Sequence, residues 1–233
     1  VSLDMKPKGD GPGTLPPRTL VLIPTELERR HLARQPDFGI DATCELCGFG
    51  PVAASARASH ALAQHQPDRV VMVGIAGTLY PRGLPVATAA VFPSVVLDGV
   101  GVGGSSEFIS AATLGFPHWP PTAADRQEHF DELPLKTPIS PAAGQLLTCC
   151  AASASPEDAQ QRREWFPGAV AEDMEGFGVA LACQLAGVGL AIVRGISNEV
   201  GDRRMERWQI SEALDAAWII ADDLIRRPSW DSQ

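Results

Sequence analysis

The feature that most limits the fold of this chain is the alternation of short apolar runs with longer segments of helical character. The expected strands are residues 18–24, 41–48, 69–73, 85–92, 169–173 and 189–194. The expected helices are residues 25–35, 52–64, a segment within 141–150, and residues 156–166, 175–186 and 205–226. Residues 69–73 (RVVMV) are almost continuously apolar, which is typical of a strand covered on both faces. The alternation predicts an α/β fold, a three-layer sandwich with one central mixed β-sheet flanked by helices.

The 233 residues are enough for one large domain. Residues 1–17 contain four prolines and three glycines, so we expect a flexible N-terminal tail before a single domain at residues 18–228. The tail has no apolar core of the kind found in signal peptides, and no uninterrupted apolar run reaches the roughly 18 residues of a membrane span. Residues 94–138 are rich in glycine and proline and give no clear pattern. In the last expected helix the buried stripe is predicted to contain Trp208, Leu214, Trp218 and Leu224.

Charge and cysteine usage narrow the possible partners. The 19 basic and 28 acidic residues give a formal charge of −9, which argues against nucleic acid or an anionic membrane as a partner but not against a free nucleoside. The five cysteines are an odd number in a chain too large to need disulfides, as expected for a cytoplasmic protein.

Several motifs resemble cofactor or metal sites and are interpreted otherwise. Cys44 and Cys47 form a CxxC, but residues three apart in a strand face opposite sides and no second CxxC follows. The glycines at 99, 101 and 104 fit a dinucleotide-binding pattern, but prolines at 117, 120 and 121 interrupt the unit that such a site requires. We therefore expect neither a metal nor a cofactor.

Three segments carry the chemical signal. Residues 73–78 (VGIAGT) place small residues at the end of a buried strand, where a ligand can approach the backbone. Residues 171–176 (AEDMEG) form an acidic cluster between a strand and a helix, and residues 193–203 (VRGISNEVGDR) are polar after an apolar strand. Each segment alone also has a structural interpretation, as a glycine corner, as favourable charge at a helix N-terminus, or as a polar loop.

Together and in this order, the three segments resemble the purine nucleosidase and phosphorylase family that includes the methylthioadenosine/adenosylhomocysteine nucleosidases. The resemblance extends over residues 18–226. Residues 196–203 (ISNEVGDR), the W-x-I at 208–210, the Ala-Leu pair at 213–214 and residues 166–180 (FPGAVAEDMEGFGVA) most resemble the futalosine hydrolase subgroup. The resemblance implies a nucleoside phosphorylase-like fold, a homo-oligomer, and hydrolysis of a purine nucleoside to release hypoxanthine in menaquinone biosynthesis.

The resemblance also implies two catalytic residues. Glu28, in the stretch PTELERR, would orient the attacking water, and Glu26 is the competing candidate because the spacing there is easily miscounted by two. Asn198 would face the departing purine. Cleavage of an N-glycosidic bond builds positive charge on the ribosyl group and negative charge on the base, so carboxylates near the sugar and a donor near the base stabilise the transition state.

The remaining implied contacts are to the substrate. Ala76 and Gly77 would line the base and sugar pocket with backbone groups, and Met174 would pack under the ribose. Glu175 would accept hydrogen bonds from the 2′- and 3′-hydroxyls, and Ser197 would face the purine. Residues 153–155 are a further, weaker candidate contact to the base.

Two departures from the family pattern refine the expectation. Adenine-specific nucleosidases of the family have Ser-Asp where this chain has Ser197 and Asn198, which favours a 6-oxopurine. Phosphorylases of the family have an arginine near the small-residue loop, and Met72 at the corresponding position cannot bind phosphate. The alternatives are a methylthioadenosine/adenosylhomocysteine nucleosidase, a nucleoside phosphorylase, and a catalytically silent purine-nucleoside binding protein.

Overall fold

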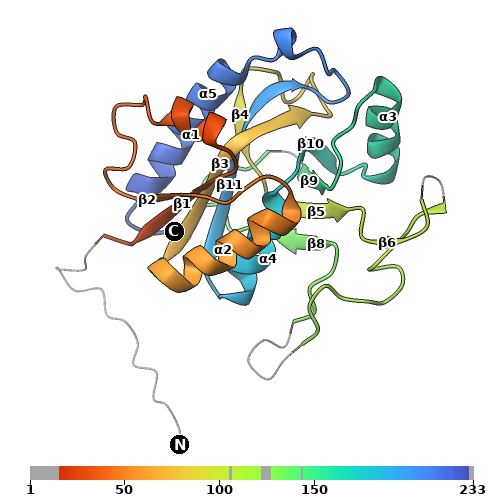
Figure 1. Cartoon of the computed structure of the whole chain (residues 1–233), viewed down its shortest axis with the longest axis horizontal. Helices are drawn as coiled ribbons and strands as arrows, with labels where there is room; N and C mark the ends of the chain where they lie inside the picture. Colours follow the sequence, from red (N-terminus) through yellow and green to blue (C-terminus); the bar gives the residue numbers. More distant parts are fainter. Residues whose placement is uncertain (1–15, 105–106, 122–126, 143, 231–233) are drawn as a thin grey trace, which may run out of the picture.

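A computed structural model describes residues 16–104, 107–121, 127–142 and 144–230, and within them a nine-stranded mixed sheet forms the centre of the molecule (Figure 1). The strand order is β2 (Thr43–Leu46), β1 (Thr19–Ile23), β3 (Arg69–Thr78), β10 (Ala169–Asp173), β9 (Gln145–Cys149), β5 (Ser94–Asp98) and β8 (Glu132–Pro134). The long strand β11 (Gly189–Glu199) pairs with β3 and with β4 (Ala89–Val91), while β6 (Gly101–Val102) and β7 (Ile109–Ser110) form a separate ribbon. β3 is parallel to β1 and β11 but antiparallel to β10, so the sheet is mixed, as predicted.

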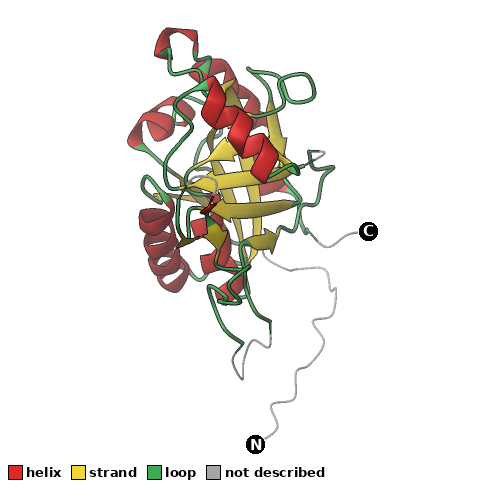
Figure 2. Ribbon diagram, turned by 90° about the vertical axis from the view of Figure 1, so that its right-hand side faces the viewer, coloured by secondary structure: helices red, strands yellow, loops and turns green. Residues whose placement is uncertain are grey.

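Helices lie on both faces of this sheet (Figure 2). α2 (Pro51–His65) and α4 (Gly176–Leu185) pack together on one face. α1 (Glu26–Leu32) and α5 (Ile210–Arg226) cover β1, β3 and β11 on the other face, where Ala159 of α3 (Pro156–Trp165) packs against the far half of the sheet. The predicted three-layer sandwich is therefore confirmed. None of the described helices combines the length and the apolar character needed to span a bilayer.

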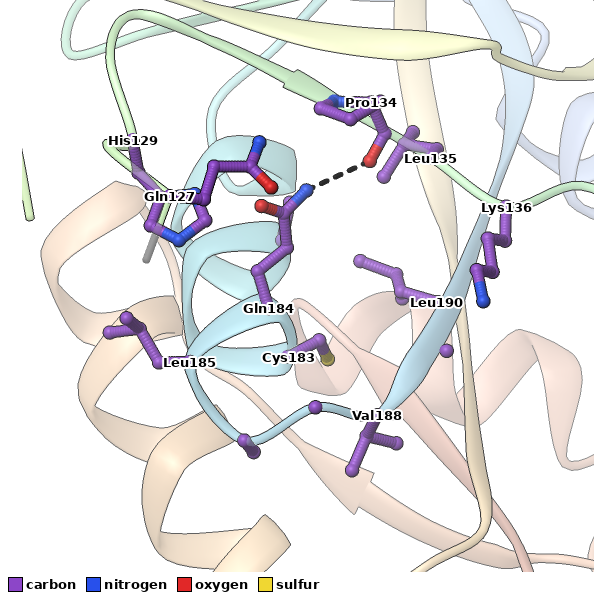
Figure 3. A pocket seen from close by; sticks show the side chains of 14 residues that line it. Gln127, His129, Pro134, Leu135, Lys136, Cys183, Gln184, Leu185, Val188 and Leu190 are labelled. Carbon is purple, nitrogen blue, oxygen red and sulfur yellow. Dashed lines mark hydrogen bonds between the residues drawn. The ribbon is translucent and has the colours of Figure 1, made fainter. Parts of the chain in front are cut away.

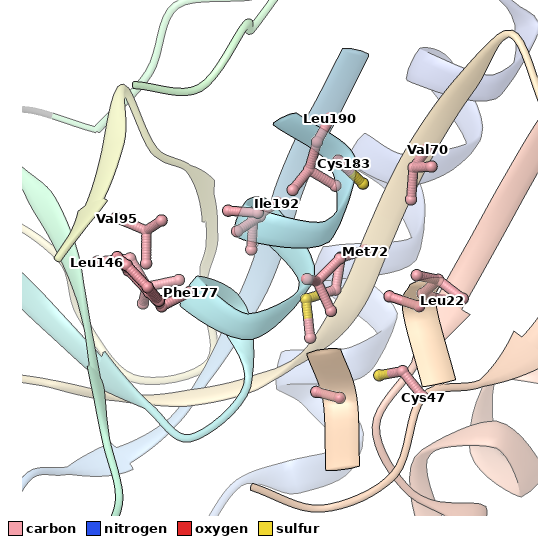
Figure 4. Close-up of a cluster of buried hydrophobic side chains, with 14 of the residues drawn as sticks. Leu22, Cys47, Val70, Met72, Val95, Leu146, Phe177, Cys183, Leu190 and Ile192 are labelled. Atoms are coloured by element: carbon pink, nitrogen blue, oxygen red, sulfur yellow. The ribbon is translucent and has the colours of Figure 1, made fainter. Parts of the chain in front are cut away.

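The core explains the continuous apolar runs of the central strands. On β1, Leu20 and Leu22 point toward α2 and α4, whereas Val21 and Ile23 point toward α5, and all four are fully buried. Figure 4 shows Leu22 in the same core cluster as Met72 and Cys47. Because both faces of the sheet are covered, apolar residues occupy consecutive positions of such a strand rather than every second one. Truncating one of these leucines to alanine would cost about 2–5 kcal/mol.

The helix expected within residues 141–150 is wrong, because Gln145–Cys149 forms β9 in the middle of the sheet. This strand pairs in parallel with both β10 and β5, and Leu146 and Leu147 are buried on opposite faces. A short apolar run cannot be assigned to a strand or a helix by periodicity alone, and here the two neighbouring strands decide.

The C-terminal helix begins later than predicted. α5 starts at Ile210, and a 3₁₀ turn at Met205–Arg207 precedes it. Leu214, Trp218 and Leu224 are buried in its stripe as predicted, whereas Trp208 lies before the helix and is only half-buried. Residues 1–15 of the predicted tail lie outside the described residues.

Candidate active site

A cavity of about 360 Å³ opens where β3, β10 and β11 end. Such an edge is where open α/β sheets place their ligands. The cavity is lined by all of the site residues predicted from the sequence: Glu28, Ala76, Gly77, Met174, Glu175, Ser197 and Asn198. Segments far apart in the chain therefore meet at one edge of the sheet.

The register of β3 and β11 aligns the small-residue and polar motifs. Ile196 pairs with Ala76 and Asn198 pairs with Gly77, so Ser197 is the extra residue of a β-bulge. The Ser197 hydroxyl donates to the Ala76 carbonyl at 3.3 Å and to Asn198 Oδ1 at 2.8 Å. A bulge re-aims side chains at a strand end, and here it turns both polar residues toward the cavity.

Glu28 is fixed by the start of α1. Thr25 is the N-cap, and its amide and hydroxyl donate to Glu28 Oε2 at 2.9 and 2.5 Å in a capping box. The Ile75 amide of β3 donates to Glu28 Oε1 at 3.0 Å, and the Glu28 residue is only 3% exposed. Three donors therefore hold this carboxylate at the cavity wall.

Glu26 has a different environment. Its carboxylate pairs with Arg29 at 2.7 Å and with Arg30 at 3.1 Å on the outer side of α1, and it does not line the cavity. The geometry separates the two candidates, although they are only two positions apart in the sequence.

Arg194, which the sequence analysis did not select, lies fully buried behind the cavity. Its Nε and Nη2 atoms donate to Asp173 Oδ2 at 3.0 and 2.5 Å, and Nη2 lies 3.5 Å from Glu175 Oε2. Its Nη1 atom has no hydrogen-bond partner among the described residues. A Cβ built on Gly74 would overlap this Nη1 atom and would lie 2.7 Å from Glu28 Oε1. The guanidinium and the Glu28 carboxylate therefore converge above Gly74, and only glycine leaves room for both.

Acidic groups outnumber this cation. Asp173 also accepts from the Thr148 hydroxyl at 2.6 Å and from the Gly176 amide at 2.9 Å, and Glu175 accepts from the Gly50 amide at 2.9 Å. Burial raises the pKa of Glu175 to about 7; Arg194 opposes this rise in pKa, and Asp173 and Glu28 add to it. Glu28, Asp173 and Glu175 together face one arginine, so the inner cavity favours a positively charged group.

The cavity contains a further buried carboxylate, Glu172, which the sequence analysis also missed. The Ser153 amide donates to Glu172 Oε1 at 2.8 Å and the Ser153 hydroxyl to Oε2 at 2.6 Å. Of the weaker candidates at residues 153–155, Ser153 lines the cavity, whereas Ser155 caps α3 through the Asp158 amide.

A second cavity, of about 680 Å³, lies at the opposite end of β11 (Figure 3). Gln184 and Lys136 are on its wall, and the Gln184 amide donates to the Pro134 carbonyl at 2.9 Å. None of the described residues that line it is a carboxylate. It is larger than the first cavity, but it lacks the acidic groups that glycosidic cleavage requires.

Met72 lies away from the cavity, so the identity of this residue does not bear directly on anion binding there. Its side chain is fully buried in the core below the sheet edge and does not line the cavity (Figure 4).

Known proteins similar to this chain agree with the family resemblance seen in its sequence. The sequence model of the phosphorylase superfamily matches residues 31–226. The futalosine hydrolase of Streptomyces coelicolor is 35% identical over 177 residues, covering 72% of each chain. That of Thermus thermophilus is 32% identical over 219 residues, covering 84% of this chain and 90% of its own.

Solved structures share the fold. The native futalosine hydrolase of Helicobacter pylori matches with a TM-score of 0.70 at 17% identity, over 89% of this chain and 97% of its own. A methylthioadenosine/adenosylhomocysteine nucleosidase of Colwellia psychrerythraea, in complex with adenine, matches with a TM-score of 0.71 at 18% identity, over 91% of this chain and 95% of its own.

Proposed function

This chain belongs to the phosphorylase superfamily, and we propose that it is the member that hydrolyses the N-glycosidic bond of futalosine to release hypoxanthine. The observation that carries the proposal is the meeting of Glu28, Glu175 and Asn198 around one cavity, in a chain whose relatives at 32–35% identity are futalosine hydrolases. The family resemblance found in the sequence is thereby confirmed.

We propose that Glu28 holds the attacking water. Its carboxylate is fixed by Thr25 and by the Ile75 amide, so it can accept a hydrogen bond from water without moving. The unused Nη1 donor of Arg194 is near the same carboxylate and could donate to the water oxygen. A water held by one acceptor and one donor is oriented for attack, and Glu28 can take its proton as the bond to the sugar forms.

The ribosyl group would lie over Met174 and Glu175. An ionised Glu175 can accept hydrogen bonds from the 2′- and 3′-hydroxyls, and its charge, with that of Glu28, stabilises the developing oxocarbenium ion. The excess of carboxylates over arginine supports this role, because it makes the inner cavity favourable for a cation.

The base would lie near Ser197 and Asn198. The side-chain amide of Asn198 donates to the Glu199 carbonyl at 2.9 Å, and the residue is half-buried at the cavity wall. A turn of this amide toward N7 and O6 of hypoxanthine would stabilise the negative charge that develops on the leaving base. One such donor is worth roughly 3 kcal/mol in the transition state.

The test is incubation of the protein with futalosine, methylthioadenosine and inosine, each with and without phosphate. We expect free hypoxanthine from futalosine at a rate that phosphate does not change. Release of adenine from methylthioadenosine alone would instead assign the chain to the methylthioadenosine/adenosylhomocysteine nucleosidases, of which one relative is 26% identical. Formation of ribose 1-phosphate derivatives would assign it to the phosphorylases, and no release at all would leave a binding protein.

We further propose that the protein acts in menaquinone biosynthesis in the cytoplasm as a homo-oligomer. The five cysteines are all free, which suits a reducing compartment. Phe49, which lines the cavity, and Val52, in the first turn of α2, are 67% and 82% exposed, and such apolar surface suits an interface between copies. Light scattering on the purified chain tests the oligomeric state.

A further inference from the structure

Glu172 is a buried carboxylate in the cavity wall that the mechanism above does not use. It is 6% exposed and lies on β10, where it pairs with Gly77 of β3. Gly77 pairs on its other side with Asn198 of β11. Paired residues of neighbouring strands direct their side chains to the same face, and both Glu172 and Asn198 line the cavity. The two polar side chains therefore flank one glycine.

The spacing of the strands fits a flat base between these side chains. Neighbouring strands lie about 4.8 Å apart, so the backbones of β10 and β11 are separated by roughly 10 Å across β3. A purine with a hydrogen bond of about 2.9 Å at each of two edges can bridge that span. Gly77 supplies a floor without a side chain, since a Cβ there would lie 2.9 Å from Val200 Cγ2 and 3.4 Å from Asn198 Nδ2.

Glu172 also has acceptor capacity to spare. Its oxygens accept the Ser153 amide and hydroxyl, and Arg162 Nε lies 3.8 Å from Oε2. An ionised carboxylate offers about four lone-pair sites, so at least one remains after these contacts. A buried group of this kind gains from a donor on the ligand, and it disfavours a ligand that presents a second acceptor.

We propose that Glu172 is a specificity-determining residue that accepts a hydrogen bond from N1–H of a 6-oxopurine base, an inference that rests on the proposed function. A 6-oxopurine carries a proton at N1. A 6-aminopurine presents a bare lone pair there, which the carboxylate repels. Glu172 reads the N1 edge while Asn198 reads the N7 and O6 edge, so the preference for the oxo base has two independent sources.

The test compares three substrates: futalosine, futalosine methylated at N1, and the 6-amino counterpart of futalosine. With the unmodified enzyme we expect kcat/KM to be roughly 10- to 100-fold lower for the second and the third than for the first, the effect of one charge-assisted hydrogen bond. Glu172→Gln should lower kcat/KM for futalosine by a similar factor. It should also reduce the ratio of kcat/KM for futalosine to kcat/KM for the 6-amino substrate. Ser153→Ala is the matched control, because it removes a donor to the same carboxylate. It should lower kcat/KM for the oxo and amino substrates by equal factors, and by less than Glu172→Gln lowers kcat/KM for futalosine.

Two results would overturn the inference. One is equal cleavage of futalosine and its N1-methyl derivative by the unmodified enzyme, a comparison that needs no variant to fold. The other is an equal loss on the oxo and amino substrates in Glu172→Gln, which would mean that Glu172 only holds the loop at Ser153. If the unmodified enzyme releases adenine from the amino substrate and no hypoxanthine from futalosine, the proposed function fails, and this inference fails with it.

Discussion

Replacement of Glu28 by glutamine tests the centre of the proposed mechanism. Glutamine keeps the volume but has one acceptor oxygen instead of two. If that oxygen keeps the Ile75 amide, the Thr25 amide loses its acceptor, while the Thr25 hydroxyl can rotate and accept from the new NH₂ group. One unsatisfied amide costs about 1–3 kcal/mol, which lowers Tm by roughly 2–12 °C in a chain of this size.

The catalytic loss should be larger. A positioned general base contributes roughly 10²- to 10⁴-fold, so kcat for hypoxanthine release should fall by two to four orders of magnitude, or about 3–5 kcal/mol of transition-state stabilisation. The assay is hypoxanthine release from futalosine under saturating substrate, with Tm measured on the same sample. The change in KM should be small, because the water is not part of the substrate.

Glu26→Gln is the matched control for that experiment. It makes the same chemical change two residues away, on a carboxylate that pairs with Arg29 and Arg30 outside the cavity. Surface pairs of this kind contribute about 0–1 kcal/mol, so both Tm and kcat should stay near their original values. Near-normal turnover of Glu28→Gln, or a greater loss in Glu26→Gln, would refute the assignment of the water to Glu28.

Four further predictions follow from the same geometry. Glu175→Ala should reduce both substrate affinity and kcat, and a 2′-deoxy substrate should already react poorly with the unmodified enzyme; equal cleavage of the deoxy and ribo forms would leave Glu175 as a helix-terminal charge only. Burial raises the pKa of Glu175 from 4.5 to about 7, so kcat/KM should fall about tenfold per pH unit below pH 7, where the carboxylate becomes protonated. The free energy of unfolding should change in the opposite direction: the stabilisation from the raised pKa is complete below pH 4.5 and is lost as the pH rises through 7. A pH–rate profile and Tm at each pH test both effects, and a flat pH–rate profile contradicts the assignment. Asn198→Asp should shift the kcat/KM ratio modestly toward 6-aminopurine nucleosides, since an aspartate repels O6; an unmodified enzyme that prefers the amino base would refute the base assignment. Gly74→Ala should lower the free energy of unfolding by about 1–3 kcal/mol and remove most of the activity, because its Cβ would displace Arg194 or Glu28. An unchanged Tm would contradict the described packing.

Sequence patterns predict the parts of the fold in which the polarity of each residue follows from its own burial. After Arg69, the strand residues 70–73 are all apolar because helices cover both faces of the sheet, and the sequence shows this directly. The segment at 145–149 (QLLTC) has a shorter apolar run, and nothing within it distinguishes a buried strand from a buried helix. Its two parallel neighbours decide, and they lie about 25 and 50 residues away.

Glu26 and Glu28 show how far a local sequence pattern distinguishes two neighbouring acidic residues. Both are acidic residues in the first turn of a helix. Thr25 precedes Glu28 by three positions, the spacing of a capping box, and that box turns Glu28 inward onto the N-cap backbone. Glu26 has its bases three and four positions ahead, so it pairs along the outer surface. The spacing separates the local partners of the two acids, but only the amide of Ile75 on β3 shows that Glu28 faces the cavity.

Glu172 and Arg194 could not be predicted as site residues from local spacing, because their neighbours at the cavity are set by the pairing of strands that are distant in the sequence. Glu172 precedes the Met-Glu pair by only two positions, and as a sequence it is one more acid before a helix. It acquires a partner for base recognition only because β10 runs antiparallel to β3 while β11 runs parallel to it, which sets residues 172, 77 and 198 in one row. Arg194 lies in the middle of β11, after five residues of apolar or glycine character, and its three acidic neighbours come from α1, from β10 and from the start of α4. A charged residue buried within a strand must be paired. The presence of Arg194 therefore requires acids from elsewhere in the chain, and the same acids make the cavity suited to a ribosyl cation.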